Sequence, residues 1–471
     1  MHYVSTRGEA ARPGFTDALL AGLARDGGLY TPDAYPSLGA EAIAGLAGRS
    51  YAEVAQSVIA PFVGDDIAPA SLKSMIGAAY KTFRHPAVAP LVQLDDNLFV
   101  LELFHGPTLA FKDAAMQLLG RLMQDALKRG HRRATIIGAT SGDTGAAAIE
   151  AFRGLDNVDV FILFPHGRVS AVQRRQMTTV DAPNIHAIAL EGTFDDCQNI
   201  LKAMFNHHVF RDEFGLSGVN SINWARIVAQ IVYFFTSAVA LGAPQRKVSF
   251  SVPTGNFGDV LAGYVAKRMG LPIGRLHIAT NSNDILARCF ANGDYEIRGV
   301  TATQSPSMDI QISSNFERAL FDAYDRDPAA IRALMAGLAQ SRHVSLPQRV
   351  RARLAEDFDA SAVSETATQA EMARVFRETG YVLDPHGAVG VHAARAALKR
   401  DAATPVIALA TAHPAKFPDA VKRATGHQPS LPPHLGDLMQ RHEKFSLLAN
   451  DAGEVERFIR RHARHARKAH A

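Results

Sequence analysis

The sequence predicts an α/β protein that contains mostly parallel sheets with helices on both faces. From about residue 97 onward, short β-rich runs alternate with helical segments. The run at 134–140 precedes the helical stretch 145–152, and the run at 247–253 precedes 259–269. Strands followed by helices in this order are typical of parallel sheets that are covered on both faces. Further runs of the same kind lie at 97–103, 158–164, 184–190, 276–280 and 404–411.

The first 90 residues or so differ from this pattern, and we expect them to be mainly helical. Apolar residues recur at helical spacing in 14–24, 41–60 and 71–80. The stretch 325–380 is again helical and more charged, and we interpret it as an accessory helical insert. The expected organisation is a mainly helical N-terminal domain (1–92), one α/β half (93–240), a second α/β half that carries the insert (241–428) and a C-terminal helical tail (429–471).

Composition and charge argue for a globular protein that does not bind nucleic acid. Apolar residues make up 47% of the 471 positions and charged residues 20%, which separates the chain from disordered sequences. The net charge is 50 − 46 = +4, and the segment 454–471 supplies all of it with six Lys or Arg against two Glu. The rest of the chain is neutral, so the body lacks the basic surface that a nucleic acid requires.

We expect a cytoplasmic protein without membrane segments. Cys197 and Cys289 lie far apart in the sequence, which excludes a disulfide framework and a cysteine zinc site and fits a reducing compartment. The N-terminus has no apolar stretch of the kind found in secretory signals. The most apolar run, 227–243, contains Gln230 and falls short of the ~20 apolar residues of a spanning helix, so we expect a core helix there.

Lys112, in the run HGPTLAFKD (105–113), is the first candidate for chemistry. It stands where a loop meets a helix, and the positive end of the helix dipole disfavours a protonated amine. Its neighbours Leu109 and Phe111 act in the same direction if they remove water. An amine with a lowered pKa suits Schiff-base chemistry, although a solvated lysine would show the same spacing.

Two loops between a strand and a helix are candidates for anion binding. In GATSGDTG (138–145), the hydroxyls of Thr140, Ser141 and Thr144 lie at a helix N-terminus, where backbone N–H groups are free to bind an anion. The glycine spacing there is G-x₃-G-x₂-G, which differs from the dinucleotide-binding pattern. The run PTGNFGD (253–259) offers a second set of amides and lacks the Lys-Ser/Thr of a Walker loop. A simple capped helix is the alternative at both places.

Two further segments carry polar residues beside apolar sequence. NSINWARI (220–227) places Arg226 ahead of the apolar run, where its guanidinium would need a phosphate, a substrate carboxylate or a protein carboxylate as partner. ATAHPAKF (410–417) puts Thr411 and His413 at the end of a predicted strand, where open α/β sheets bind ligands. His413 is equally consistent with a hydrogen-bonded core histidine.

A metal site is not predicted. His462 and His465 are one helical turn apart but have no third ligand near them in the sequence. The Arg- and His-rich segment 454–470 fits a solvated helix or a frayed end.

Taken together, these segments resemble the threonine synthase family, whose members are fold-type II enzymes that use pyridoxal 5′-phosphate (PLP). The resemblance covers nearly the whole chain. It implies a fold like that of the tryptophan synthase β subunit, with two open, twisted, mostly parallel sheets, flanking helices and a mainly helical N-terminal domain. The matching runs are YVSTRG (3–8), DGGLYTP (26–32), HGPTLAFKD (105–113), GATSGDTG (138–145), EGTFDDCQ (191–198), NSINWARI (220–227), PTGNFGD (253–259) and ATAHPAKF (410–417).

The resemblance also implies how the cofactor is held. Lys112 would form the Schiff base with PLP and transfer protons, and Thr411 would hydrogen-bond the pyridine nitrogen. Asp143 would lie close to the 3′-oxygen, although many relatives have Asn at this place. The cofactor phosphate would be held by Gly255, Asn256, Phe257 and Gly258.

For the substrate, the resemblance implies two binding regions. Thr140, Ser141 and Thr144 would bind the carboxylate. Asn220, Ser221 and Arg226 would bind the phosphate, with Arg168 or Lys202 as a further basic neighbour.

The implied reaction is the conversion of O-phospho-L-homoserine and water to L-threonine and phosphate, by a monomer or a homodimer. A related PLP-dependent lyase or dehydratase that acts on a hydroxy- or phospho-amino acid is the alternative. A binding or scaffold protein without catalysis is disfavoured, because such a protein would not need a reactive lysine.

Overall fold

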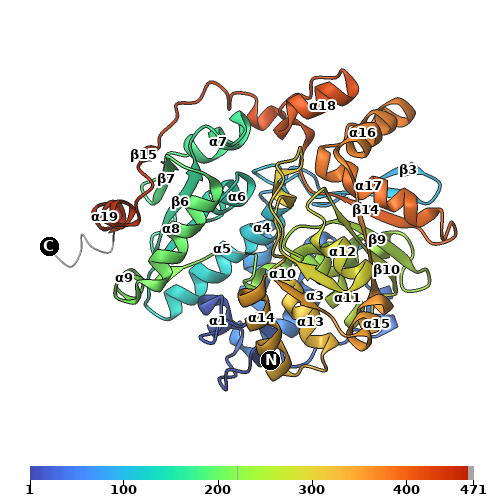
Figure 1. Ribbon diagram of the computed structural model, residues 1–471, viewed down its shortest axis with the longest axis horizontal. Coiled ribbons are helices and arrows are strands. Elements are labelled where there is room, and N and C mark those ends of the chain that lie inside the picture. The colour runs from blue at the N-terminus through green and yellow to red at the C-terminus, as the bar shows by residue number, and fades with distance from the viewer. Residues whose placement is uncertain (220, 465–471) are drawn as a thin grey trace. The chain divides into compact units, whose positions relative to one another are not determined.

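The computed structural model describes residues 1–219 and 221–464; Asn220, His465 and the rest of the C-terminal tail lie outside the described residues (Figure 1). The contacts divide the chain into two compact units, which are described separately below. Unit 1 comprises residues 1–19, 23–115 and 221–429. Unit 2 comprises residues 20–22, 116–220 and 430–471. The segments 1–92, 93–240, 241–428 and 429–471 expected from the sequence stay predictions.

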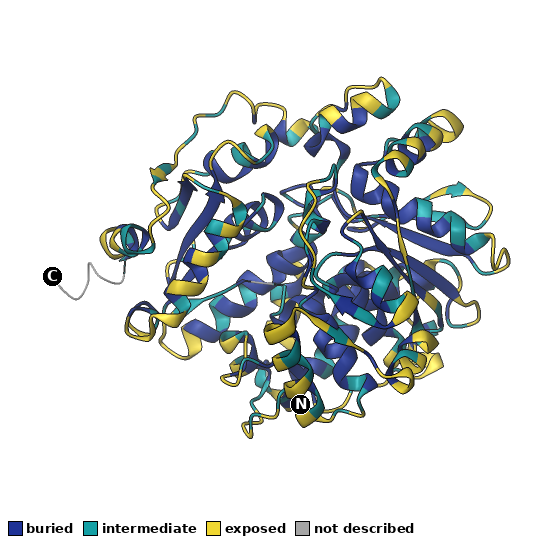
Figure 2. Ribbon diagram, viewed as in Figure 1, coloured by how far each residue is buried: buried dark blue, intermediate teal, exposed yellow. Residues whose placement is uncertain are grey.

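Unit 1 is built on a six-stranded sheet with the order β13-β10-β9-β14-β4-β3. All neighbours are parallel except β3 and β4, which are antiparallel. Every residue of β9 and β14 is buried, as expected for central strands with both faces covered (Figure 2). The strands are β3 (Leu91–Asp95), β4 (Leu98–Glu102), β9 (Val248–Pro253), β10 (Ile273–Thr280), β13 (Phe358–Ala362) and β14 (Val406–Ala410).

The N-terminal part of the chain is mainly helical, as the apolar spacing predicts. The expected helix over 41–60 is interrupted, however, because a new helix begins at the cap residue Ser50, whose side chain forms a capping box with Glu53. The helices are α1 (Phe15–Ala21), α2 (Ala40–Ala44), α3 (Tyr51–Val63) and α4 (Pro69–Tyr80), and β1 (Tyr3–Ser5) pairs with β2 (Tyr30–Pro32).

The remaining helices of unit 1 flank the sheet or extend from it. They are α10 (Trp224–Ala240), α11 (Gly258–Arg268), α12 (Ile285–Asn292), α13 (Phe316–Ala323), α14 (Pro328–Ser341), α15 (Gln348–Asp357), α16 (Glu365–Thr379), α17 (Pro385–Leu398) and α18 (Pro418–Thr425). The apolar run at 227–243 forms the core helix α10, as predicted. No helix among the described residues is long and apolar enough to cross a membrane.

The stretch 325–380 is less purely helical than the sequence suggests. Besides α14, α15 and α16, it contains β12 (His343–Ser345), which pairs with β11 (Asp294–Glu296), and the strand β13. Strand β13 is the edge strand of the main sheet and pairs in parallel with β10. The segment therefore completes the sheet, because burial of Phe358 and pairing with β10 outweigh the helical pattern around it.

Unit 2 contains a five-stranded, wholly parallel sheet with the order β15-β7-β6-β5-β8. Its strands are β5 (Ala134–Ala139), β6 (Val158–Pro165), β7 (Ile185–Leu190), β8 (Leu216–Ser217) and β15 (Ser446–Leu448). Its helices are α6 (Asp143–Phe152), α7 (Ala171–Thr178), α8 (Phe194–Asn206), α9 (His208–Phe214) and α19 (Ala452–His462). Helix α5 (Lys112–Arg129) begins in unit 1 and continues in unit 2.

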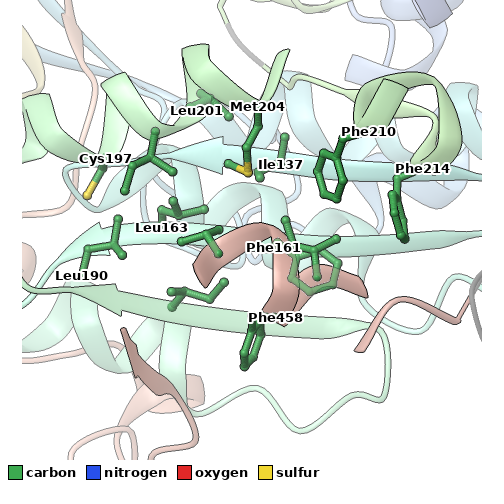
Figure 3. Close-up of a cluster of buried hydrophobic side chains, with 14 of the residues drawn as sticks. Ile137, Phe161, Leu163, Leu190, Cys197, Leu201, Met204, Phe210, Phe214 and Phe458 are labelled. Atoms are coloured by element: carbon green, nitrogen blue, oxygen red, sulfur yellow. The ribbon is translucent and has the colours of Figure 1, made fainter. Parts of the chain in front are cut away.

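The C-terminal region is an integral part of unit 2. Strand β15 pairs with β7, and Phe458 of α19 joins the apolar cluster on the sheet (Figure 3). After α19, Arg464 donates from its Nε to Asp159 Oδ1 at 2.5 Å and from its backbone N–H to Oδ2 at 3.0 Å. Asp159 is fully buried, and its carboxylate is held by these two hydrogen bonds from Arg464 and by Arg133, whose Nη2 lies 3.8 Å from Oδ2.

We therefore expect Asp159→Ala to loosen the C-terminal region. Amide hydrogen exchange in β15 and α19 should accelerate about 10- to 100-fold, which corresponds to the ~1–3 kcal/mol lost when a charged group loses its buried partner. Mass-spectrometric exchange measures this directly, with the exposed Asp156→Ala as the control. Unchanged exchange rates in α19 would contradict the role assigned to Asp159.

Candidate active site

The loop before α5 is shaped by hydrogen bonds within the run HGPTLAFKD. Asp113 accepts from the backbone N–H of Thr108 at 2.7 Å and from the Thr108 hydroxyl at 2.8 Å. Leu109 adopts a left-handed conformation with φ of 61°. Gly106 packs so closely on Asp113 that an added Cβ would lie 2.4 Å from the Asp113 Cβ. These constraints place Lys112 at the first residue of α5, the junction that the sequence predicts.

This lysine loop is fastened to the carboxyl end of β14. The Phe111 N–H donates to the Thr411 carbonyl at 2.8 Å, and the His413 N–H donates to the Leu109 carbonyl at 3.0 Å. The fully buried Lys416 donates to the Thr108 carbonyl at 2.8 Å. The structure thus brings Lys112 and Thr411 together, and ATAHPAKF is the segment that holds the lysine loop.

The turn from β9 to α11 forms a second part of the site. Among the described residues, no protein acceptor lies within hydrogen-bond reach of the backbone N–H groups from Gly255 to Asp259. Phe257 is left-handed, with φ of 63°, and directly precedes α11. A Cβ on Gly255 would lie 2.9 Å from the Ser307 carbonyl, so only glycine fits there. Unpaired amides at a helix N-terminus fit a phosphate group.

A segment that the sequence does not single out supports this turn. The Ser313 hydroxyl donates to the Gly255 carbonyl at 2.6 Å. The Asn315 backbone N–H donates to the Asn256 carbonyl at 3.0 Å, and its side-chain amide donates to the Ser221 carbonyl at 3.1 Å. Asn315 therefore links the two loops expected to bind the cofactor phosphate and the substrate phosphate.

The same segment joins these loops to the N-terminal residues. The fully buried Arg318 donates to the Tyr30 carbonyl at 2.9 Å and to the Ile222 carbonyl at 2.6 Å, and it stacks on Trp224 at 5.3 Å. Burial lowers the pKa of Arg318 to about 9. Arg318 also donates to the side-chain oxygen of Asn315. Because its other two hydrogen bonds go to backbone carbonyls, Arg318 fixes the positions of the main chain at Tyr30 and Ile222.

Glu317 adds a second link to the N-terminal residues, and its contacts give a structural role to the run YVSTRG. It accepts from the Thr6 hydroxyl at 2.6 Å and pairs with Arg7 at 2.8 Å. The polar run SSNFER (313–318) at the start of a helix, with Glu and Arg adjacent, is the sequence signal that could have revealed these residues.

Arg226 lies in the first turn of α10, after the cap residue Asn223. Arg226 is 3% exposed, and burial lowers its pKa to about 10. Because Arg226 is buried, its guanidinium is kept away from bulk water, as a site for a phosphate dianion requires. On the same helix, the Tyr233 hydroxyl donates to Asp259, whose pKa burial raises to about 7. Asn220, which precedes Arg226 in the predicted set, lies outside the described residues.

The loop GATSGDTG belongs to unit 2, and its part in the site stays a prediction. The Thr140 hydroxyl accepts from the N–H groups of Gly142 and Gly145 at 2.9 and 3.0 Å, so it braces the turn. Asp143 is buried and accepts from the Gln173 amide at 2.8 Å.

The other predicted residues of unit 2 differ in exposure. Ser141 and Thr144 are half-buried at the start of α6. The proposed basic neighbours Arg168 and Lys202 are exposed.

His413 is a hydrogen-bonded core histidine, one of the two roles that the sequence allows for it. Its Nδ1 accepts from the Ala415 N–H at 3.1 Å, and its ring packs edge-on against Phe104. Burial lowers the pKa of His413 to about 4, so the ring is neutral at pH 7. Among the described residues there is no group of three metal-ligating side chains, and His462 bonds the Phe458 carbonyl.

The fold and the placement of these residues indicate a class of enzyme. Fold-type II PLP-dependent enzymes combine a buried parallel sheet, a lysine at the start of a helix and a turn whose unpaired amides can hold a phosphate. A model of pyridoxal-phosphate-dependent enzymes matches residues 82–411. Models of the threonine synthase N terminus and C-terminal region match residues 2–80 and 387–459.

Individual relatives identify the family. Threonine synthase from Pseudomonas aeruginosa is 52% identical over 98% of both chains. A crystal structure of PLP-bound threonine synthase from Brucella melitensis superposes with a TM-score of 0.96 at 60% identity, covering 98% of this chain and 100% of that one. Human threonine synthase-like 2 is 36% identical over 95% of this chain and 94% of its own. The chain belongs to the threonine synthase family, and it is a PLP-dependent enzyme.

The buried state of His413 predicts a pH-dependent stability. A histidine pKa held near 4 in the folded state, against about 6.5 when unfolded, contributes stability that is present above pH 6.5 and lost as the pH falls towards 4. His413→Asn keeps an oxygen where Nδ1 accepts from Ala415 but removes the titration. Between pH 7 and pH 5, we expect the variant to lose about 1–2 kcal/mol less stability than the unmutated protein in urea denaturation.

His186 in unit 2 also has its pKa lowered to about 4 by burial, so part of the pH dependence should remain in this variant. Identical pH profiles for the variant and the unmutated protein would contradict the assignment to His413.

Asn315 should control cofactor binding although it does not lie in the phosphate turn. In Asn315→Ala, the carbonyls of Asn256 and Ser221 lose a shared donor, and we expect PLP to bind the apoenzyme about 10- to 100-fold more weakly. Fluorescence titration measures the affinity, with the exposed Gln340→Ala as the control. Equal affinity in both variants would show that Asn315 does not support the turn.

Proposed function

We propose that this enzyme converts O-phospho-L-homoserine and water to L-threonine and phosphate, in the cytoplasm and as a monomer or homodimer. The observation that carries the proposal is the placement of Lys112. Its loop is bonded to Thr411, while the turn at Gly255 to Asp259 offers amides that no described protein group uses. Membership of the threonine synthase family supports this reaction over others of the same fold.

The residues of unit 1 fit PLP. Lys112 would hold the cofactor covalently, and the amides from Gly255 to Gly258 would hold its phosphate. Thr411 would hydrogen-bond the pyridine nitrogen, and a hydroxyl at that place does not enforce a protonated ring. When bound, PLP supplies an electron sink that makes the hydrogens of the neighbouring substrate carbons acidic.

Lys112 is the group that we assign to proton transfer. When free of the cofactor, the Lys112 amine would take a proton from one substrate carbon and return it to another. The fastened loop supports this role, because it fixes the start of α5 and hence the point from which the lysine side chain reaches.

Two regions would bind the substrate. Arg226 and Ser221, with Asn220, would bind the phosphate that leaves, since a departing dianion requires a cation that water does not screen. Thr140, Ser141 and Thr144 would bind the carboxylate, and Asp143 would lie near the 3′-oxygen of the cofactor. The hydrogen bond from Gln173 holds Asp143 in a single orientation.

A PLP-dependent lyase acting on a hydroxy- or phospho-amino acid is the second candidate. Such an enzyme would use the same cofactor residues and would differ in the product that it releases. The buried Arg226 favours a phosphorylated substrate, and release of the products distinguishes the two reactions.

The test is to incubate the PLP-loaded protein with O-phospho-L-homoserine and to measure phosphate and threonine together. We expect equal amounts of both. Phosphate with 2-oxobutanoate in place of threonine would establish a lyase, and the absence of both products would contradict the proposal.

Arg226→Ala should separate substrate binding from cofactor binding. We expect kcat/KM for O-phospho-L-homoserine to fall about 100-fold or more, since a charge-assisted contact to a phosphate is worth roughly 3 kcal/mol in a site without water. The visible absorbance of bound PLP should remain, which also shows that the variant folds.

The exposed Arg246→Ala serves as the matched control for this variant. An unchanged kcat/KM in Arg226→Ala would contradict the assignment.

A further inference from the structure

Ser307 lies opposite the reactive lysine on a short 3₁₀ turn, Pro306–Met308. The Lys112 Nζ donates to the Ser307 hydroxyl at 3.4 Å. No motif in the sequence draws attention to Ser307, and the roles described above do not include it. It is nevertheless a side chain in contact with the amine on which the chemistry depends.

A buried pair of residues fixes this turn. The Ser307 backbone N–H donates to Nε2 of His386 at 3.2 Å, and Nδ1 of the same ring lies 2.7 Å from Asp384 Oδ2. His386 and Asp384 are each 2% exposed. Because Nε2 accepts a hydrogen bond, the ring proton is on Nδ1 and points to the carboxylate.

Asp384 is itself held rigidly. It is the cap residue of α17, and its two oxygens accept from the N–H groups of Gly387 at 2.8 Å and His386 at 3.0 Å. The chain of contacts therefore runs from the start of α17, through the imidazole, to the backbone of Ser307. This arrangement favours positioning by His386 over acid–base catalysis, because protonation of Nε2 would break its bond to the turn.

The other side of the turn is also fixed. The Ser307 carbonyl lies against Gly255 of the phosphate turn, at 2.9 Å from an added Cβ. The neighbouring Ser305 is fully buried, and its hydroxyl accepts from the Asn281 amide at 2.9 Å. Ser307 cannot move away from Lys112 without disturbing both of these contacts.

We propose that Ser307 is a further catalytic residue, whose hydroxyl holds the amine of Lys112 whenever the lysine is free of the cofactor, and that His386 and Asp384 are its positioning residues. This proposal depends on the proposed function in one respect only, which is that Lys112 holds PLP and transfers protons. A hydroxyl oxygen that accepts from the amine stabilises its protonated form and keeps the nitrogen on the side of the reacting carbons.

The first test uses PLP loading, which requires no substrate. The neutral amine is the form that reacts with PLP, so the loading rate of the apoenzyme rises with pH as the amine loses its proton. Ser307→Ala should shift the midpoint of this rise to lower pH by about half a unit, because the protonated amine loses an acceptor. Ser307→Thr restores the hydroxyl and should restore the midpoint.

The second test uses turnover. Ser307→Ala should lower kcat for O-phospho-L-homoserine about 10- to 100-fold, with KM within about threefold and the PLP content unchanged, since substrate contacts stay intact. Ser307→Thr should recover most of the loss. If the protein has no activity towards this substrate, the loading experiment still decides the role of Ser307.

The positioning role of His386 can be tested with two variants of similar chemistry. His386→Gln can place an oxygen near the position of Nε2 and keep an acceptor for the Ser307 N–H. His386→Asn keeps a donor to Asp384 but does not reach Ser307. We expect His386→Asn to show the kcat and the loading midpoint of Ser307→Ala, and His386→Gln to lie within about threefold of the unmutated protein in kcat.

A merely structural histidine would give equal losses in both His386 variants, which would overturn its positioning role. A loading midpoint and kcat unchanged in Ser307→Ala would overturn the proposal as a whole.

Discussion

The backbone hydrogen bond from Phe111 to Thr411 is the constraint on which the site depends. It ties the loop before α5 to the carboxyl end of β14, so Lys112 starts its helix close to Thr411, the predicted partner of the pyridine nitrogen, which directly follows that strand. The loop cannot shift alone, because Lys416 and His413 hold its backbone at Thr108 and Leu109. Buried backbone groups that found no such partners would cost about 1–3 kcal/mol each, which makes this one geometry strongly preferred.

The segment from Ser305 to Arg318 fixes the turn at Gly255 to Asp259 in a similar way. Its backbone and side chains hold Gly255, Asn256 and Ser221, and α13 ties them to the N-terminal residues through Glu317 and Arg318. The amides of the turn are thereby left to a ligand, since their orientation is fixed by groups behind them. The N-terminal runs YVSTRG and DGGLYTP take part in this support. They contribute Thr6, Arg7 and the Tyr30 carbonyl as supports.

Much of the fold and part of the site follow from the sequence. The strand and helix alternation predicts both parallel sheets, because apolar runs flanked by loops have few alternatives, and the position of Lys112 at a helix start is confirmed. Strand β13 could not be predicted, because it pairs with β10, which is distant in the sequence, and because the segments on either side of it in the sequence are helical. Asn315 and His386 could not be predicted because their side chains bond backbone carbonyls and N–H groups, which produce no recognisable sequence motif. Ser307 could not be predicted because its hydroxyl contacts Lys112 across 195 positions of the sequence. The roles of Thr140, Ser141, Asp143 and Thr144 stay predictions.

The assignments above require that PLP be held through the amine of Lys112. Reduction of the PLP-loaded protein with borohydride, followed by digestion and mass spectrometry, tests it directly, because reduction fixes the cofactor to the amine that carries it. We expect one pyridoxyl group per chain, on the peptide that contains Lys112 and on no other. A modified lysine elsewhere, such as the buried Lys416, or an unmodified Lys112 in a fully loaded protein, would show that Lys112 does not hold the cofactor.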